Sequence, residues 1–186
     1  MEKQIICVVG DIGAGKDAVA EYIVEKYDAG HYTFSHTLKK ILHELHLPDD
    51  RKNYALLAEA LRETFGGEIL SSALYEEVKE MPNEIIVAYG ARKKVEIDYF
   101  KELRQFHLIY VDTDLKTRYE RLTKRKQKPD DEMKTFEQFQ EDHKRPADRE
   151  ISQLKDIADF VIDNNGTLEE LHQKVDQIVR NIRNEK

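Results

Sequence analysis

Seven residues near the start of the chain have the types and the spacing needed to bind a chain of phosphates. In the pattern G-x-x-x-x-G-K they are Gly10, Asp11, Ile12, Gly13, Ala14, Gly15 and Lys16. Glycines let the backbone wrap phosphates with its N–H groups pointing inward, and the lysine reaches the β and γ phosphates. A turn that merely joins two elements is the alternative, but three glycines and a lysine in this order favour a nucleoside triphosphate such as ATP.

The next residue is Asp17, where this pattern usually has serine or threonine as a hydroxyl ligand of Mg²⁺. A carboxylate there could bind the ion directly or through water. It could equally be a favourable negative charge in the first turn of a helix. We expect Asp17 to be the metal ligand and leave the second interpretation open.

The elements around these residues must hold them between a strand and a helix. Residues 4–9 form an apolar run typical of a strand buried on both faces of a parallel sheet, and residues 17–27 have apolar positions at helical spacing. Further strands are expected over 31–35, 84–89, 106–111 and 160–163. Helices are expected over 38–45, 55–65, 69–79, 93–103, 115–125, 136–143, 151–157 and from 168 onward. This alternation predicts a three-layer α/β fold with a parallel sheet of about five strands and helices on both faces.

The composition narrows the class of protein. With 186 residues, of which 40% are hydrophobic, the chain fits one domain. The net charge of −7 is scattered, so no basic stripe indicates a nucleic-acid partner. One cysteine, Cys7, excludes an intrachain disulfide and favours a reducing cytoplasm. No apolar run approaches about 18 residues, so we expect a cytoplasmic protein with no membrane partner.

With these residues in view, the sequence resembles the P-loop kinases grouped around dephospho-CoA kinase, phage-type deoxynucleoside monophosphate kinases and an archaeal group of adenylate-kinase-like proteins. The similarity runs nearly from end to end. Residues 15–17 look like the phosphate loop of deoxynucleotide and phosphomevalonate kinases, and residues 34–39 resemble the segment that opens the acceptor-binding region of the former. Residues 51–53, 61–66 and 89–92 resemble segments of the archaeal group. Residues 158–171 resemble the C-terminal strand, base-contacting loop and closing helix of all three.

The resemblance implies a separate role for each part of the chain. It implies a single domain over 1–186, a helical insertion at about 36–80 that binds the acceptor, and a short lid at about 121–149. The implied acceptor-binding residues are His36, Arg51, Arg62 and Arg92. A planar guanidinium can grip phosphate oxygens bidentately. Exposed arginines with no ligand are the alternative for Arg62 and Arg92.

Arginines at 118, 121 and 125 recur at helical spacing, and Arg121 and Arg125 lie one turn apart on one face. In the resembling kinases, lid arginines stabilise charge on the migrating phosphoryl group. The implied catalytic residues are therefore Lys16, Arg92, Arg121 and Arg125, with Arg145 and Arg149 as further cations. A solvated basic helix face is the alternative.

Two further positions bear on the site. Tyr89 stands where the archaeal group has an aspartate, and a tyrosine carries no charge near neutral pH. Asp112 or Asp114 could take its place, although Asp114 fits a helix N-cap better. After the last strand, Asn164 and Gly166 are expected to contact ATP, with an ordinary Asn-Asn-Gly turn as an equal alternative.

These features predict an ATP- and Mg²⁺-dependent phosphotransferase acting on small-molecule nucleotides, namely a nucleoside or deoxynucleoside monophosphate kinase. A kinase of dephospho-CoA or of another small metabolite is the first alternative, because acceptor choice depends on pocket shape. A nucleotide-binding module or weak ATPase is the second, and the tyrosine at position 89 is its best support.

Overall fold

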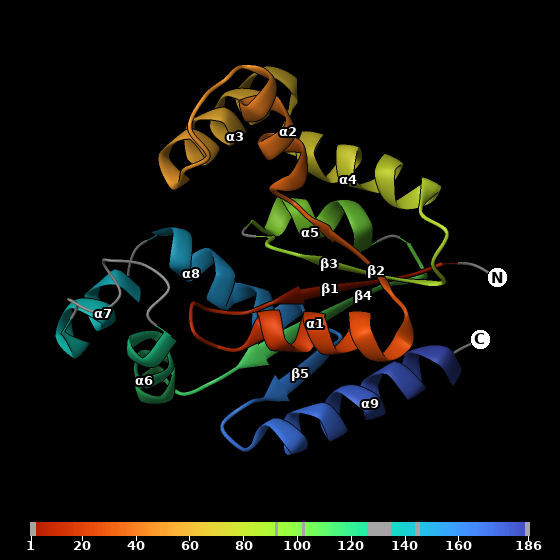
Figure 1. The fold of residues 1–186 in the computed structure, drawn as a ribbon, viewed down its shortest axis with the longest axis vertical. Coiled ribbons are helices and arrows are strands. Elements are labelled where there is room, and N and C mark those ends of the chain that lie inside the picture. Colours follow the sequence, from red (N-terminus) through yellow and green to blue (C-terminus); the bar gives the residue numbers. More distant parts are fainter. Residues whose placement is uncertain (1–2, 92, 102, 126–134, 144–145, 185–186) are drawn as a thin grey trace.

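The fold is a parallel sheet between two layers of helices (Figure 1). The computed structural model describes residues 3–91, 93–101, 103–125, 135–143 and 146–184. Its strands are β1 (Gln4–Val9), β2 (Gly30–Thr33), β3 (Ile85–Tyr89), β4 (Phe106–Asp112) and β5 (Phe160–Asp163). They are all parallel, in the order β2-β3-β1-β4-β5. The predicted three-layer α/β fold with five strands is confirmed.

Alternate residues of the central strand enter two separate cores. Ile6 and Val8 of β1 pack toward α1 (Lys16–Tyr27) and α9 (Leu168–Asn184). Ile5, Cys7 and Val9 pack on the opposite face, toward α4 (Ile69–Glu80) and α5 (Lys94–Lys101). Because both faces of β1 are covered, the strand reads as a continuous apolar run, as parallel strands usually do. This burial fixes the end of β1, and with it the phosphate loop that follows.

Three helices form an insertion between β2 and β3: α2 (His36–Glu44), α3 (Arg51–Phe65) and α4. Leu38, Ala58 and Leu70 make a small core of their own, one residue from each helix. In Figure 1 the α2 and α3 helices project beyond the edge of the sheet. The insertion is therefore packed within itself as well as against the main sheet.

The remaining helices follow β4. They are α6 (Leu115–Arg125), α7 (Phe136–His143) and α8 (Pro146–Gln153), and a short 3₁₀ turn (Leu154–Ile157) leads into β5. The sequence predicted one helix over 151–157. That prediction was wrong at the start, because α8 begins earlier, at a proline, which suits the first position of a helix. Its end at Ile157 is the end of the 3₁₀ turn. No helix among the described residues is long and apolar enough to cross a bilayer.

Candidate functional site

The loop between β1 and α1 can adopt its shape only because of its glycines. Gly13 and Gly15 have φ values of 80° and 95°, in the left-handed region. A Cβ at Gly13 would lie 2.7 Å from the carbonyl oxygen of Arg118, and one at Gly15 would lie 2.3 Å from Nδ2 of Asn164. The loop therefore passes close to α6 and to the segment after β5, and it ends at the N-terminus of α1, where the helix dipole favours an anion.

Two side chains fasten this loop from outside. Thr113, after β4, donates a hydrogen bond from Oγ1 to the carbonyl oxygen of Ala14 at 3.0 Å. Asn164, after β5, donates one from Nδ2 to the same oxygen at 2.7 Å. Both residues are buried. Their strands end at the same edge of the sheet as β1, so the sheet itself positions the phosphate loop.

Within the loop, Asp11 is bonded to protein groups. Its Oδ2 accepts a hydrogen bond from the hydroxyl of Tyr110 at 3.1 Å, and its Oδ1 accepts one from Ser152 of α8 at 3.1 Å. Nη1 of Arg118, on α6, lies 3.5 Å from Oδ2. Burial and the nearby Asp11 charge raise the pKa of Tyr110 well above its usual range. The Asp11 side chain thus links the loop to β4, α6 and α8.

Lys16 and Asp17 open α1, as the pattern predicted. Nζ of Lys16 lies 4.0 Å from Oδ1 of Asp17, and their side chains are 26% and 36% exposed. Protein sites usually hold Mg²⁺ through one or two carboxylates together with phosphate oxygens and water. A half-exposed carboxylate next to the phosphate loop fits that role, and the described residues contain no cluster of three or more His, Cys, Asp or Glu that could hold a metal ion.

The arginines of α6 divide into two environments. Arg118 is 4% exposed, donates from Nε to the carbonyl oxygen of Thr113 at 3.1 Å, and lies over the ring of Phe139 in α7. Arg121 donates from Nη2 to the carbonyl oxygen of Asn164 at 2.9 Å, and its Nη1 is buried without a hydrogen-bond partner among the described residues. Arg121 therefore lies beside Gly15 of the phosphate loop, and its expected role stays a prediction. The side chain of Arg125 lies outside the described part of the chain.

The expected acceptor arginines are only partly described. Arg62, on α3, is paired with the buried carboxylate of Glu96 on α5, and its side chain is 18% exposed. It is thus no solvated surface arginine. Arg92 lies outside the described residues, as does Arg145, and nothing is described of the side chains of Arg51 and Arg149. Their expected roles stay predictions.

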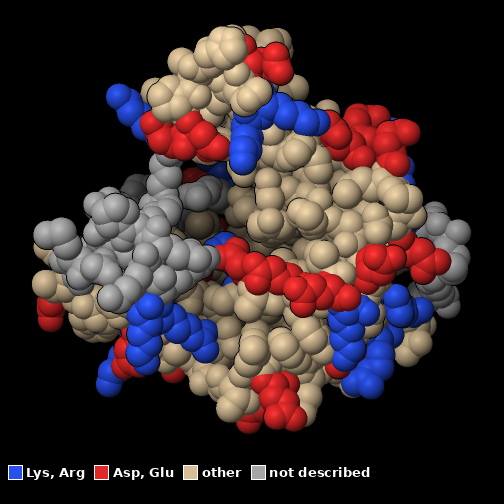
Figure 2. All heavy atoms as spheres, in the orientation of Figure 1, with Lys and Arg blue, Asp and Glu red and all other residues tan. Residues whose placement is uncertain are grey.

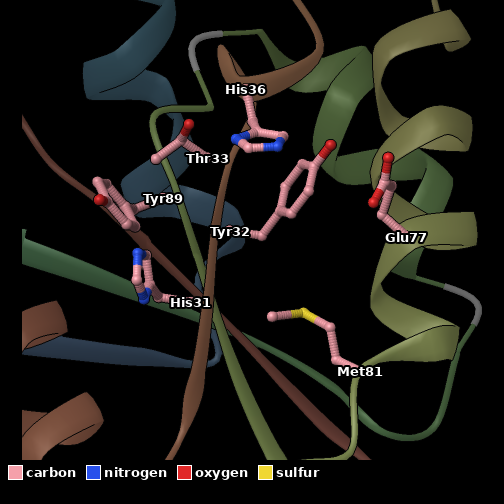
Figure 3. A pocket seen from close by; sticks show the side chains of 7 residues that line it. All are labelled: His31, Tyr32, Thr33, His36, Glu77, Met81 and Tyr89. Carbon is pink, nitrogen blue, oxygen red and sulfur yellow. The ribbon is translucent and has the colours of Figure 1, made fainter. Parts of the chain in front are cut away.

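A cavity of about 270 Å³ lies at the edge strand β2. Figure 3 shows its lining, which comes from β2, β3, the start of α2 and the end of α4: His31, Tyr32, Thr33, His36, Glu77, Met81 and Tyr89. The rings of Tyr32 and His36 are 4.8 Å apart at 57°. The cavity therefore offers aromatic surfaces with a few polar groups, and it includes His36, which the resemblance assigned to the acceptor.

Tyr89 borders both this cavity and the region of the phosphate loop. It pairs in register with Val8 of β1, one residue before that strand ends. Burial, and then the charges of Asp17 and Glu21, raise the pKa of Tyr89 above its ordinary value. Tyr89 is therefore a neutral hydrogen-bonding group near Asp17, at the position where the archaeal group that the sequence resembles has an aspartate.

The aspartates after β4 have other partners. Oδ2 of Asp112 accepts a hydrogen bond from Lys155 at 2.6 Å. Asp114 directly precedes α6, and its carbonyl oxygen accepts the backbone N–H of Arg118 at 2.9 Å, as expected at a helix start. No contact that the structure describes joins the side chain of either aspartate to the phosphate loop, and their expected role in place of a carboxylate at position 89 stays a prediction.

The turn after β5 is both a helix start and a support for the loop. Thr167 and Glu170 exchange hydrogen bonds in a capping box at the start of α9. A Cβ at Gly166 would lie 2.0 Å from Oε2 of Glu170. The expected contacts of Asn164 and Gly166 with ATP stay predictions, and the observed role of Asn164 is to hold the loop.

Acidic side chains border the loop on its exposed side. Asp17, Glu21 and Glu25 follow at intervals of four along α1, so they share one face of the helix. Figure 2 shows acidic atoms across the centre of the molecule, where α1 lies in Figure 1. Among the described residues, positive charge near the loop therefore comes from Lys16 and from Arg118 and Arg121 of α6, not from the outer face of α1.

Comparison with known protein families shows the family to which the chain belongs. Residues 6–143 match the family model described as AAA domain, and the chain belongs to that family. The chain is also similar to a UPF0200 protein of Methanocaldococcus jannaschii, at 29% identity over 97% of this chain and 91% of that protein. A UPF0200 protein of Sulfurisphaera tokodaii is 28% identical over 96% of this chain and 97% of that protein.

Solved structures share the architecture. TT1252 from Thermus thermophilus has a TM-score of 0.63 at 18% identity, covering 97% of this chain and 98% of that one. Shikimate kinase from Bacteroides thetaiotaomicron has a TM-score of 0.65 at 14% identity, covering 95% and 98%. At sequence identities this low, the similarity shows the fold alone, and that fold is P-loop kinase-like.

Proposed function

We propose that this protein is an ATP- and Mg²⁺-dependent phosphotransferase that phosphorylates a nucleoside or deoxynucleoside monophosphate. The phosphate loop carries the proposal, because Gly13, Gly15 and Lys16 form a cradle between a buried strand and a helix N-terminus. Arg121 supports it, since one of its N–H groups is buried beside Gly15 without a described partner. Lys16 and Arg121 would neutralise charge on the donor.

The cavity at β2 supports a separate place for the acceptor. It shares Tyr89 with the region of the phosphate loop, so a molecule held there would lie near the donor. The rings of Tyr32 and His36 suit a planar base, and Thr33 and Glu77 offer polar contacts. The phosphate of that acceptor would be held by Arg62, Arg92 and Arg51.

Catalysis here depends mainly on positioning and neutralisation. Phosphoryl transfer needs little covalent help from the protein, so a tyrosine at position 89 does not exclude it. Asp17 would hold Mg²⁺, which neutralises charge on the phosphates when bound. Tyr89, kept protonated, can donate a hydrogen bond to an acceptor oxygen.

Two other functions remain to be separated from this one. A kinase of dephospho-CoA would use the same donor site with a larger acceptor. A nucleotide-binding module with weak ATPase activity would bind ATP on the same loop and would use no acceptor. Tyr89 favours the module, and the partnerless N–H of Arg121 near the loop favours transfer.

The test is ADP formation from ATP and Mg²⁺ with each nucleoside monophosphate, each deoxy form, dephospho-CoA or shikimate added separately. We expect one nucleoside monophosphate to stimulate turnover at least ~10-fold over ATP alone. Lys16→Ala should abolish ATP binding, while Lys79→Ala, an exposed lysine of α4, should leave turnover unchanged. Turnover that no acceptor stimulates would refute the proposal.

A further inference from the structure

One buried carboxylate contacts both segments that carry the expected acceptor arginines. Glu96, in the first turn of α5, is 2% exposed. Its Oε1 accepts a hydrogen bond from Nη2 of Arg62, and its Oε2 accepts the backbone N–H of Lys93 at 3.2 Å. Lys93 directly follows Arg92 in the sequence. Glu96 therefore ties helix α3 of the insertion to the segment that follows β3.

Packing alone gives no reason for an ion pair at this place. Moving two charges out of water costs free energy that hydrophobic side chains of similar volume would not cost, and such replacements are often neutral or stabilising. Ser71 already joins α4 to α5 by donating to the carbonyl oxygen of Glu96 at 3.1 Å. The carboxylate of Glu96 is thus better explained by what it does to Arg62.

Arg62 keeps donors that no described residue uses. A guanidinium has five N–H donors, and the hydrogen bond described for Arg62 comes from Nη2. Its Nε is buried without a hydrogen-bond partner among the described residues. A buried donor left unpaired costs about 1–3 kcal/mol, so such groups point to an absent partner. An oxygen of a phosphate group would supply that partner.

We propose that Glu96 is a positioning residue of the acceptor site, which holds the guanidinium of Arg62 in place to receive the acceptor's phosphate. This inference rests on the proposed function, because it presumes a phosphorylated acceptor. Glu96 does not itself touch the acceptor. By fixing one edge of the guanidinium, it removes rotamer freedom that binding would otherwise have to remove.

The test compares Glu96→Gln, Arg62→Lys and the double variant, with the nucleoside monophosphate that most stimulates the wild-type protein as acceptor. We expect Glu96→Gln to raise the acceptor KM at least ~10-fold, as loss of a charge-assisted contact implies, with the ATP KM within about twofold of wild type. Arg62→Lys should have a similar effect. The double variant should be no worse than the worse single one, because Glu96 acts through Arg62.

Competitive inhibition by inorganic phosphate gives a second readout, which does not depend on the KM of the acceptor. Phosphate should inhibit the wild-type protein in competition with the acceptor, and this inhibition should weaken at least ~10-fold in Glu96→Gln. Asp98→Asn is the matched control, since Asp98 lies two residues further along α5 and pairs with Lys94 on the surface. It should change neither the acceptor KM nor the inhibition.

The inference is wrong if Glu96→Gln leaves the acceptor KM within twofold of wild type, raises both KM values alike, or adds its effect to that of Arg62→Lys. Should Glu96→Gln fail to fold, Glu96→Asp keeps the charge on a shorter side chain and takes the same test. Failure of the proposed function looks different, because then no acceptor stimulates even the wild-type protein.

Discussion

Arg121 is the single residue whose surroundings point most directly to a bound anion. Its Nη2 is held by the carbonyl oxygen of Asn164, while its Nη1 lies 3.7 Å from the position that a Cβ on Gly15 would take. That Nη1 is buried without a hydrogen-bond partner among the described residues. A guanidinium fixed at one end and unsatisfied at the other suits a phosphate oxygen.

Arg121→Lys should therefore lower kcat by about 100-fold, because a lysine keeps the charge but cannot hold Asn164 and a phosphate oxygen together. The measurement is steady-state turnover with saturating ATP and acceptor. Arg180→Lys on the exposed face of α9 is the matched control and should have no effect. A turnover rate of Arg121→Lys within threefold of wild type would remove this arginine from the site.

At the scale of elements, the close approach of the phosphate loop to α6 is a requirement for binding. Gly13 and Gly66 both have positive φ, at 80° and 100°, so alanine should destabilise the fold at either position. A Cβ at Gly13 would meet the carbonyl oxygen of Arg118, whereas nothing lies within 4 Å of one at Gly66. Alanine would therefore strain the backbone at both positions, but only at Gly13 would its Cβ also collide with α6 beside the phosphate loop.

Gly13→Ala should lose at least ~10-fold in affinity for ATP, because the loop must move away from α6. Gly66→Ala should bind ATP as the wild-type protein does, although it unfolds more easily. Titration calorimetry with ATP, below the melting temperature of both variants, measures this difference. Equal losses of affinity would mean that strain, and not the approach to α6, governs the loop.

Helices α1 and α9 are joined by a carboxylate whose ionisation should matter for stability. Asp176 accepts hydrogen bonds from Tyr22, Lys26 and Tyr27. Burial by itself would raise the pKa of Asp176, but these hydrogen bonds together lower it below its ordinary value. Since the folded protein favours the charged form, this stabilisation is present above the ordinary pKa of about 3.9 and is lost as pH falls through the lower folded value.

Asp176→Asn should therefore melt at a lower temperature than the wild-type protein at pH 7, and the difference should shrink as the pH falls below about 4. Thermal denaturation across pH 3–7 measures this. Asp98→Asn, on the surface of α5, should track the wild-type curve. A difference that stays constant down to pH 3 would mean that the charge of Asp176 contributes nothing.

At the scale of the whole molecule, the strands of the sheet could be predicted from the sequence. All five strands lie within two residues of their predicted ranges. The central strands β1, β3 and β4 are runs of buried side chains that end where the chain leaves the core, whereas the edge strands β2 and β5 are only partly buried. Glycine spacing likewise located the phosphate loop. The start of α8 was missed, since the residues before Ile151 are polar and charged and give no apolar periodicity.

The residues that hold the site in place were harder to predict, because each one bonds to a partner that is distant in the sequence. Asn164 and Thr113 hold Ala14 across 150 and 99 residues, and Glu96 meets Arg62 across 34. Single polar residues have no periodicity that would indicate such pairs. Glu96 stands between Val95 and Ile97, but charged residues flank them at positions 94 and 98, so the local sequence did not mark Glu96 as buried.

The most direct test of the central claim follows the γ-phosphoryl group itself. Wild-type protein, Mg²⁺ and ATP labelled in the γ-phosphate are mixed with each nucleoside monophosphate, and the labelled products are separated and identified. If the protein is the proposed kinase, the label will move to one nucleoside monophosphate to form its diphosphate, and Lys16→Ala will form none. If the label is found only in inorganic phosphate, whatever acceptor is present, the chain hydrolyses ATP without transferring its phosphate and the account is contradicted.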